Sequence, residues 1–422
     1  MAELAEQARQ LPTRVRTVLG LLFLAAVINY VDRGSLSMAT ASKAFKTQIP
    51  LSPEATGWLL SGFFWTYALC QLGTGWLVDR YSVNRIFGIG FALWSLATIL
   101  AAFVHNGEQL FVLRMLLGVG EAVTFPCFAK IISASFPAEK RGVPNAVIDA
   151  GTKIGPALGV FLGAVLIKSY DWRVMFFVLG AASLVWLLPW LIWGPRSGDR
   201  TKPTQAAEAG PGFWQILCNR QALGTFLGAG SYTYAYFFLL TWLPKYLVDI
   251  RGFSMDDLKT QGSALFLVSA AAALVAGWLS DRWIRRGMST TKARKIMVVG
   301  GLLLSMAALP AALAKDVSST VAWLAVAYIA FGIFASNLWA ISQTLAGEAA
   351  AGKWAGLQNC LGGLTGIAAP IITGIIVQHT GSYVLAFIFA ACLAAIGAAS
   401  YLLIVGKIEP IDWSSGREDH RT

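Results

Sequence analysis

GWLVDR at Gly75–Arg80 recurs as GWLSDR at Gly277–Arg282, and the two stretches differ at one position. Each stretch ends an apolar segment and is followed by further arginines, at Arg85 after the first copy and at Arg285 and Arg286 after the second. Matched residues of the two copies lie 202 positions apart in a chain of 422 residues. Because the same pattern closes the second apolar segment of each half, the sequence predicts two copies of one helical unit.

The composition places this repeat in a membrane. Hydrophobic residues make up 56% of the chain and charged residues 13%, and the mean hydropathy is +0.61. Soluble domains carry about 25% charged residues, so the composition excludes a water-soluble fold. The net charge of +11 does not indicate nucleic-acid binding, because the basic residues are few and lie between apolar blocks.

Twelve apolar spans form two groups of six, and each is long enough for a helix that crosses a bilayer with about 20 residues. Their approximate limits are 15–39, 55–78, 85–104, 108–135, 142–167, 173–194, 221–248, 260–280, 295–314, 319–346, 354–378 and 383–405. The expected fold class is an all-α polytopic membrane protein. The expected domains are residues 1–194 and 221–406 as six-helix halves, 195–220 as a cytoplasmic linker and 407–422 as a cytoplasmic tail.

Lysine and arginine residues indicate how the chain crosses the membrane. Most of the 33 lie in segments that share a side with the amino terminus, whereas loops 104–109 and 378–383 hold none. Cytoplasmic loops are enriched in these residues, so both termini are expected in the cytoplasm. The opposite orientation is the alternative.

Ionisable residues inside spanning helices point to function. A charge at the centre of such a helix costs about 2.5–3.5 kcal/mol on insertion scales, so it is kept where it is paired or used. Six candidates lie within the expected spans: Asp32, Arg33, Arg114, Glu121, Asp149 and Lys153. The structural alternatives stay open: solvation of Asp32 and Arg33 at a helix end, a permanently paired Glu121, and an internal ion pair between Asp149 and Lys153, which are four residues apart.

Arg114 and Glu121 lie seven residues apart, two turns along one helix face. Burial and a neighbouring cation shift the pKa of a carboxyl group in opposite directions, and that balance lets a carboxyl group load and release a proton. The spacing therefore places Arg114 and Glu121 where such a balance is possible, and a permanently paired structural glutamate is the alternative. Glycines such as Gly151 and Gly155 are expected to allow close approach of a neighbouring helix.

The first copy, with the pattern G-x-L-x-D-R-x-x-x-x-R at Gly75–Arg85, resembles the loop signature of the major facilitator superfamily, with Ser82 where that family usually has glycine, and the G-x-L-x-D-R part recurs at Gly277–Arg282. Finer motifs resemble its anion:cation symporter family, which includes bacterial galactonate, hexuronate and glucarate carriers and the lysosomal sialic acid carrier. These motifs are Asn29-Tyr-Val-Asp32-Arg33, Tyr67-Ala-Leu-Cys-Gln71, Arg114-x3-Gly118-x2-Glu121-Ala-x3-Pro126, Phe136-Pro-x3-Arg141 and Thr241-Trp-Leu-Pro244-x-Tyr246-Leu. The resemblance implies the major facilitator fold.

The resemblance also implies roles for individual residues. Arg33 would hold a substrate carboxylate, Asp32 would be sensitive to protonation, and Glu121, linked to Arg114, would be the main coupling acid. The family also places substrate-binding residues at Tyr67, Trp339 and Asn359. It uses the loop residues Asp79, Arg80, Asp281 and Arg282 as a conformational gate. For the neutral pocket residues, ordinary packing is the alternative.

Two departures from the galactonate-type pattern concern the substrate. That pattern has an uncharged polar residue at the position of Thr152, and the departure in this chain is the charged residue Lys153 directly after it. A second cation suits a substrate with two carboxylates, unless Asp149 cancels the charge of Lys153. The galactonate carriers use a glutamine early in span 7, where this chain has Ala229. In the same span Tyr232 is a further substrate-binding candidate.

The sequence therefore predicts proton-coupled uptake of a small organic anion, such as a sugar acid, by alternating access. The alternative is an exporter or uncoupled facilitator of the same fold for drugs, lipids or other solutes. An enzyme is not expected, because the sequence holds no cluster of metal-ligand residues. The expected partners are a carboxylate substrate, protons and the lipid bilayer, with no cofactor, no nucleic acid, a monomeric state and a location in the bacterial inner membrane.

Overall fold

The computed structural model describes residues 13–136, 142–195 and 211–413. All of the regular secondary structure in these ranges is helical. Contacts divide the chain into two compact units, Met1–Lys202 with Leu240–Leu267 and Pro203–Leu239 with Val268–Thr422.

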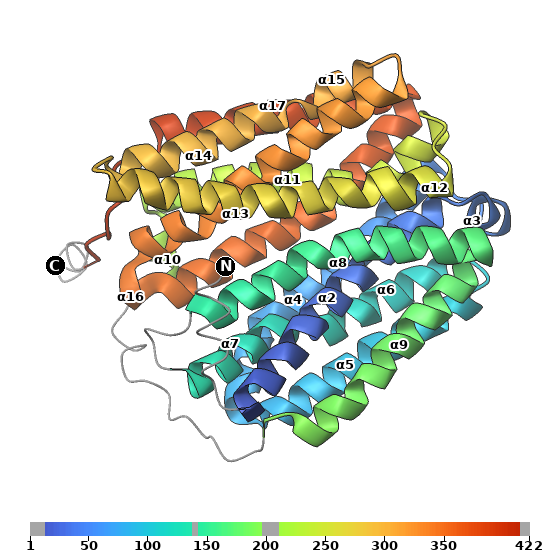
Figure 1. Ribbon diagram of the computed structural model, residues 1–422, viewed down its shortest axis with the longest axis horizontal. Helices are drawn as coiled ribbons and strands as arrows, with labels where there is room; N and C mark the ends of the chain where they lie inside the picture. Colours follow the sequence, from blue (N-terminus) through green and yellow to red (C-terminus); the bar gives the residue numbers. More distant parts are fainter. Residues whose placement is uncertain (1–12, 137–141, 196–210, 414–422) are drawn as a thin grey trace. The chain divides into compact units, whose positions relative to one another are not determined.

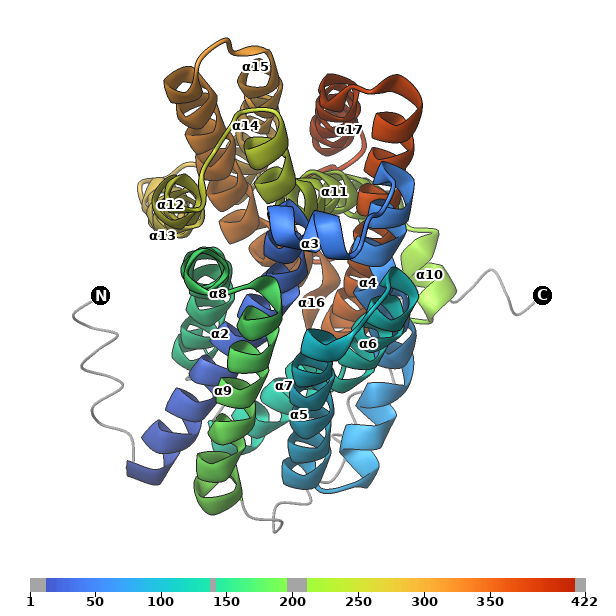
Figure 2. The same cartoon turned by 90° about the vertical axis from the view of Figure 1, so that its right-hand side faces the viewer.

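The first unit contains the first six expected spans. Its helices are α2 (Thr13–Ala41), α3 (Lys43–Gln48), α4 (Pro53–Arg80), α5 (Val83–Leu100), η1 (Ala101–Phe103), α6 (Gly107–Glu121), α7 (Thr124–Ser135), α8 (Gly142–Ser169) and α9 (Trp172–Trp193). Helix α2 packs against α8, α4 against α6, and α5 against α9, as Figures 1 and 2 show. The expected span 108–135 is two helices, α6 and α7, because the helix is interrupted at Ala122 and Val123.

The remaining expected spans follow in the second half of the sequence. Their helices are α10 (Phe213–Leu217), α11 (Arg220–Asp249), α12 (Met255–Asp257), the π-helical η4 (Leu258–Gly262), α13 (Ser263–Arg285), α14 (Thr290–Ser305), α15 (Ala308–Leu313), α16 (Val317–Thr380) and α17 (Tyr383–Leu403). Within the second unit α14 packs on α16 and α17. The last part of α11, together with α12 and η4, belongs to the first unit, where η4 packs on α8.

Ten helical segments among the described residues are long and apolar enough to cross a membrane. Two expected spans fall outside this set, those of α4 and α11, although these helices have 28 and 30 residues. Both are long enough for a bilayer core of about 30 Å, but their glycine, tryptophan and tyrosine residues lower their hydropathy. The arrangement is consistent with twelve spanning helices.

A single glycine interrupts α16, which covers two expected spans. Gly347 has φ 63° and ψ −179°, and helical hydrogen bonding resumes on both sides of it. A residue with a side chain rarely adopts positive φ, whereas glycine does so at little cost. The helix therefore changes direction at Gly347, and the two spans that the sequence predicts are the two arms of α16.

A row of glycines holds α8 against α2. Gly151, Gly155, Gly159 and Gly163 are four residues apart and so lie along one face of α8. A Cβ atom added at Gly155 would lie 2.5 Å from Cβ of Tyr30 and 2.7 Å from the carbonyl oxygen of Val27. The close approach expected at Gly151 and Gly155 is confirmed, and it places the helix that carries Asp32 and Arg33.

Gly155→Ala is expected to destabilise the protein because neither contacting group is the flexible end of a side chain. Overpacking of this kind costs about 1–3 kcal/mol. The matched control is Gly20→Ala in α2, where no atom lies within 4 Å and where alanine favours the helix by up to about 1 kcal/mol. Thermal unfolding in detergent should show a lower melting temperature for Gly155→Ala alone, and equal melting temperatures would contradict the packing argument.

Candidate functional site: a buried ion pair in the first unit

Arg33 of α2 and Glu121 at the end of α6 form a buried ion pair. Nε of Arg33 donates to Oε2 of Glu121 at 2.9 Å, and the two side chains are 6% and 0% exposed. The two residues lie 88 positions apart in sequence, and they meet because α6 packs on α4, which also contacts α2. Both residues are therefore kept from bulk water, and Arg33 is not solvated at a helix end.

Three aromatic rings surround the guanidinium group of Arg33. Its central carbon lies 4.8 Å from the ring centroids of Tyr30 and Phe63 and 4.6 Å from that of Tyr67. Phe63 and Tyr67 follow one another on α4 and stack at 5.0 Å. A guanidinium over an aromatic face gains cation–π attraction, which is about 2 kcal/mol where water is excluded. The guanidinium group is planar by its own bonding, and these rings restrict where that plane lies.

Arg114 lies behind this pair and contacts the backbone of α2. Its Nη1 donates to the carbonyl oxygen of Asp32 at 3.2 Å and its Nη2 to that of Arg33 at 3.4 Å. The group within hydrogen-bond distance of Glu121 is thus Arg33, which the sequence analysis assigned to the substrate, rather than Arg114. The difference arises because the Arg114 side chain reaches the carbonyl oxygens of Asp32 and Arg33, whereas the Arg33 side chain reaches the Glu121 carboxylate.

Asp32 is completely buried on the same helix. The Ser183 hydroxyl and the Trp94 indole approach its carboxylate, although neither carboxylate oxygen makes a hydrogen bond of regular geometry. Asp32 is adjacent to Arg33 in sequence but not paired with it, which agrees with the angle of about 100° between neighbouring side chains on a helix. Asp32 and Arg33 therefore interact with different neighbouring residues.

Unused hydrogen-bonding capacity is concentrated around these charges. Among the described residues, several buried polar atoms near the ion pair have no hydrogen-bond partner. They are both side-chain atoms of Asn29, both carboxylate oxygens of Asp32, Nη2 of Arg33, Nε of Arg114 and Oε1 of Glu121. An unmet buried polar group costs about 1–3 kcal/mol, so a cluster of such groups is a place where water, a proton or a ligand is expected to bind.

Lys153 and Asp149 form a weaker and more accessible pair on α8. Nζ of Lys153 lies 3.9 Å from Oδ1 of Asp149, and the two side chains are 25% and 64% exposed. Thr152 is 7% exposed, and its hydroxyl donates to the carbonyl oxygen of Asp149 at 2.7 Å. An exposed carboxylate at that distance compensates the lysine only in part.

The other substrate-binding candidates lie in the second unit. Tyr232 is 8% exposed and stacks on Phe334 at 4.6 Å and on Tyr236 at 6.1 Å. Tyr234 contacts Phe389 instead, as expected for the opposite face of α11. Trp339 is 40% exposed and Asn359 is also exposed. Tyr232 is therefore held by ring packing, whereas Trp339 and Asn359 have accessible side chains.

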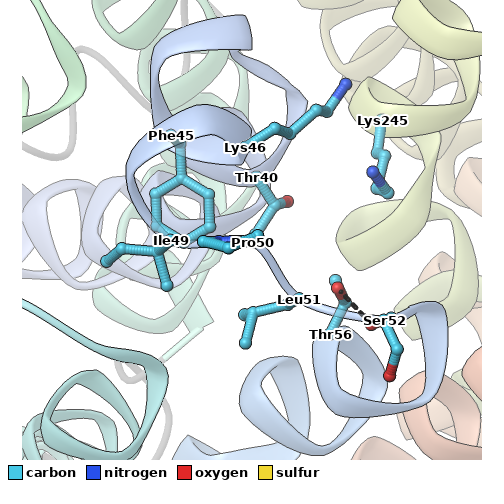
Figure 3. Close-up of a pocket in the computed structure, with 9 residues that line it drawn as sticks. All are labelled: Thr40, Phe45, Lys46, Ile49, Pro50, Leu51, Ser52, Thr56 and Lys245. Carbon is cyan, nitrogen blue, oxygen red and sulfur yellow. Dashed lines mark hydrogen bonds between the residues drawn. The ribbon is translucent and has the colours of Figure 1, made fainter.

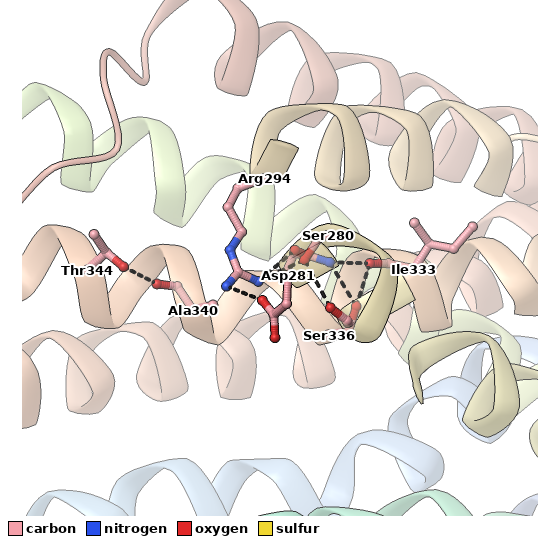
Figure 4. A network of polar contacts seen from close by, with 9 residues as sticks. Ser280, Asp281, Arg294, Ile333, Ser336, Ala340 and Thr344 are labelled. Atoms are coloured by element: carbon pink, nitrogen blue, oxygen red, sulfur yellow. Dashed lines mark hydrogen bonds and ion pairs between the residues drawn. The ribbon is translucent and has the colours of Figure 1, made fainter. Parts of the chain in front are cut away.

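The second copy of the repeated loop forms a polar network inside its own unit (Figure 4). Arg294 of α14 donates to Asp281 at 2.9 Å, to the Ser280 hydroxyl at 3.1 Å and to Oδ1 of Asn337 at 3.0 Å. Arg282 lies over the ring of Trp278 at 4.9 Å. Asp281 and Arg282 thus have partners close by in the second unit.

The first copy of the loop is described less completely. Arg80 is exposed at the end of α4, and the Asp79 side chain lies outside the described part of the structure. Nζ of Lys130 on α7 donates to the carbonyl oxygen of Val78 at 2.7 Å. This contact fixes the end of α4 next to α7. The gating role of the four loop residues stays a prediction.

Sequence reasoning did not assign Tyr30 and Phe63, which complete the ring cage, or Trp94 beside Asp32. Helical spacing could have indicated the first two, since Tyr30 precedes Arg33 by three residues and Phe63 precedes Tyr67 by four. No comparable signal was available for Trp94, because α5 meets α2 only through the tertiary fold.

Comparison with known proteins identifies a matching family. The profile of the Major Facilitator Superfamily matches residues 22–291 and 260–421. The chain is 30% identical over 426 residues to the probable galactarate/D-glucarate transporter of Escherichia coli (strain K12), covering 94% of this chain and 95% of the relative. It is 29% identical to the D-galactonate transporter of Escherichia coli O6:H1 (strain CFT073), covering 93% and 95% of the two chains.

A solved structure shows the same fold. The crystal structure of a bacterial homolog of the human lysosomal transporter Spinster, in an inward-facing and unoccupied conformation, superposes with a TM-score of 0.80. The match covers 94% of this chain and 98% of that one at 18% sequence identity. At this identity the likeness concerns the fold alone.

Proposed function

This chain belongs to the Major Facilitator Superfamily, and on that premise we propose that it takes up a small hydroxylated carboxylate together with protons, by alternating access. It is a membrane transporter rather than an enzyme. The observation that carries the proposal is the buried contact between Arg33 and Glu121. Arg33 is a cation suited to bind a carboxylate through its planar fork of donors, and here it is bound to a carboxyl group that can accept a proton.

The contact makes proton and anion binding depend on one another. While Glu121 is charged, it occupies Nε of Arg33. Protonation of Glu121 removes that charge and frees Arg33 for a substrate carboxylate. By linkage, a bound carboxylate must favour the protonated form of Glu121 by the same factor. A proton and an anion are then bound and released together, which is the requirement for symport.

The charge balance of the site supports the same conclusion. Asp32, Arg33, Arg114 and Glu121 contribute two positive and two negative charges, and all lie in buried surroundings. Adding an anion without a proton would leave one uncompensated negative charge, and unpaired charges are costly in such a place. A proton on Glu121, or on Asp32, restores neutrality before the site changes its access. A buried pair of opposite charges does not suit a pocket for apolar drugs or lipids.

Sugar acids are the proposed substrate class. Relatives with about 30% identity are named as galactarate, D-glucarate and D-galactonate transporters. In this chain α8 carries a further cation, Lys153, whose side chain is 25% exposed, and this favours a diacid over a monoacid. Tyr67 and Thr152 of the first unit, and Tyr232, Trp339 and Asn359 of the second, are proposed to contact the hydroxylated carbon chain.

The remaining parts of the proposal concern the setting of the protein. The bacterial relatives and the distribution of lysine and arginine favour the inner membrane with both termini in the cytoplasm. Asp79, Arg80, Asp281 and Arg282 are proposed to stabilise one of the two access states, because a gate needs contacts made in one state only. The proposed coupling ion is the proton, no cofactor is required, and one chain is proposed as the working unit.

The proposal is tested with the purified protein in proteoliposomes. An imposed gradient, acidic outside, should drive accumulation of D-glucarate above its external concentration, and a protonophore should abolish the accumulation. Uptake that only reaches equilibrium and ignores the protonophore would assign the chain to uncoupled facilitators. Thermal shifts should rank diacids above monoacids, since binding stabilises by RT ln(1 + [L]/Kd), and Lys153→Gln should remove that ranking.

A further inference from the structure

We propose that a cavity at the α2–α4 connection is a second anion-binding site, which captures the carboxylate of the substrate before it reaches Arg33. The cavity measures about 340 Å³ and is formed by the end of α2, by α3, by the start of α4 and by Lys245 of α11. All of these residues belong to the first unit. The inference deepens the proposed function and rests on it for the identity of the anion.

Two lysines give the cavity its charge. Figure 3 shows Phe45 and Ile49 on one side of the cavity and Lys245 on the other, with Lys46 extending towards Lys245. Among the described residues that line the cavity, none is acidic. The Lys46 and Lys245 side chains are 31% and 15% exposed, so a small anion can reach both ammonium groups.

A single carboxylate is shared by the two lysines. Asp249, one turn beyond Lys245 on α11, accepts from Lys46 and accepts from Lys245 at 2.9 Å. One negative charge cannot compensate two ammonium groups, and each ammonium has three donors. The cluster therefore keeps a net positive charge and unused donors that face the cavity. Exposed Lys43 on α3 adds to the local positive potential.

The rest of the lining suits a hydroxylated acid. Thr56 donates its hydroxyl to the carbonyl oxygen of Ser52 at 2.9 Å, and Thr40 donates to that of Ser37 at 3.0 Å. Because their protons are engaged, the oxygens of these hydroxyls present lone pairs, which accept hydrogen bonds from substrate hydroxyl groups. The volume falls within the range of about 300–1,000 Å³ that is usual for small-molecule sites.

The position of the cavity along α2 suits an entry site. Thr40 follows Arg33 by seven residues, which is about 10 Å along the helix. The α2–α4 connection lies at the opposite end of α2 from the amino terminus, and in the proposed topology that end faces the outside. A partly hydrated cationic site raises the local concentration of anions and their rate of arrival without the affinity of a buried site.

The charge of Lys46 is sensitive to alkaline pH. Burial lowers the pKa of Lys46, Asp249 opposes that shift, and the neighbouring Lys245 and Lys43 add to it. Lys46 therefore loses its charge at a lower pH than a fully exposed lysine does. Capture of anions at the cavity should weaken as the external pH rises into the alkaline range.

Lysine acetylation tests binding without requiring transport. An amine-acetylating reagent is applied to the intact protein with and without D-glucarate, and modification of each lysine is followed by mass spectrometry. D-Glucarate at twice its dissociation constant should slow acetylation of Lys46 and Lys245 about threefold, as the factor 1 + [L]/Kd requires, and leave Lys43 unchanged. Protection should persist in Arg33→Gln. No protection, or equal protection of Lys43 or by uncharged sorbitol, would overturn the proposal.

Transport kinetics then test the role in capture. The double variant Lys46→Gln/Lys245→Gln should raise the KM for D-glucarate uptake about tenfold, as loss of two attractive charges at an encounter site does, and leave kcat unchanged. The control Lys43→Gln removes one charge from the short helix α3, at a position outside the cavity, and should leave KM within about twofold; the single variant Lys46→Gln, which removes one charge from the same helix inside the cavity, should raise KM by more. An equal rise in KM for the double variant and for Lys43→Gln would overturn the proposal.

Asp249→Asn separates capture from a purely structural ion pair. If the lysines only tie α3 to α11, removing their shared carboxylate should impair uptake as their own replacement does. If they capture anions, Asp249→Asn frees both ammonium groups and lowers KM. If the wild-type protein transports no sugar acid but D-glucarate still protects Lys46 and Lys245 from acetylation, the proposed function is wrong and the anion site is supported.

Discussion

Glu121→Gln is expected to abolish accumulation driven by a pH gradient, while exchange of labelled for unlabelled substrate should continue. Glutamine has nearly the shape of the protonated acid, and its amide oxygen can still accept from Nε of Arg33, which lies 2.9 Å from Oε2 in the native pair. It carries no titratable proton, so anion binding no longer depends on proton binding. Gradient-driven uptake should fall by two orders of magnitude or more, about the loss expected when a positioned proton-transfer group is removed.

The matched control for this result is Glu108→Gln. Glu108 lies in the first turn of the same helix and is exposed, so its replacement removes an equal charge without touching the buried pair. Accumulation and exchange should both stay near the wild-type level. Accumulation by Glu121→Gln at the level of Glu108→Gln would remove Glu121 from the coupling mechanism and leave Asp32 as the remaining buried carboxyl of the site.

The sequence was sufficient for the fold because the signals there are long and periodic. The repeated loop at Gly75–Arg80 and Gly277–Arg282, together with the apolar spans, predicted the helices within a few residues. Hydropathy alone would have missed α4 and α11, whose aromatic and glycine residues give them a weak signal. The exact path at Gly347 was not predictable, since many glycines in these spans look alike and one adopts positive φ inside α16.

Residue identities at the site were predictable, but their partners were not. Arg33 and Glu121 stand out because charges are rare in spanning helices. Their direct contact joins two helices that are far apart in sequence, and no local spacing reveals it. Arg114, the partner that the sequence predicted, does interact electrostatically with Glu121, but its hydrogen bonds go to the backbone of α2. Asn337 shows the same limit. In the sequence it lies two residues before the pocket candidate Trp339, whereas in the folded chain it is completely buried and accepts from Arg294.

Arg33→Lys should weaken substrate binding about 10- to 100-fold although the positive charge is kept. Arginine binds a carboxylate through two parallel donors, whereas lysine offers a compact, strongly hydrated ammonium. Lysine also cannot keep a planar group over the rings of Tyr30, Phe63 and Tyr67. Loss of one charge-assisted hydrogen bond accounts for about 1.5–3 kcal/mol. Thermal shift titration with D-glucarate measures the affinity of both proteins.

Because Arg33→Lys keeps the positive charge, it tests the geometry of the carboxylate contact rather than the stability of the fold. A lysine at position 33 still faces Glu121, so the unliganded protein should keep a melting temperature near that of the wild type. Arg251→Lys is the matched control, because Arg251 also lies over a tyrosine ring, at 5.4 Å from that of Tyr246, and donates to its hydroxyl at 2.7 Å, outside the site. Since both variants exchange a stacked arginine for lysine, selective loss of affinity at position 33 follows only if the guanidinium fork itself holds the carboxylate. If Arg33→Lys instead binds D-glucarate with wild-type affinity, Arg33 serves only to compensate the charge of Glu121. The substrate carboxylate must then bind another cation, and Lys153 is the next residue to test by substitution.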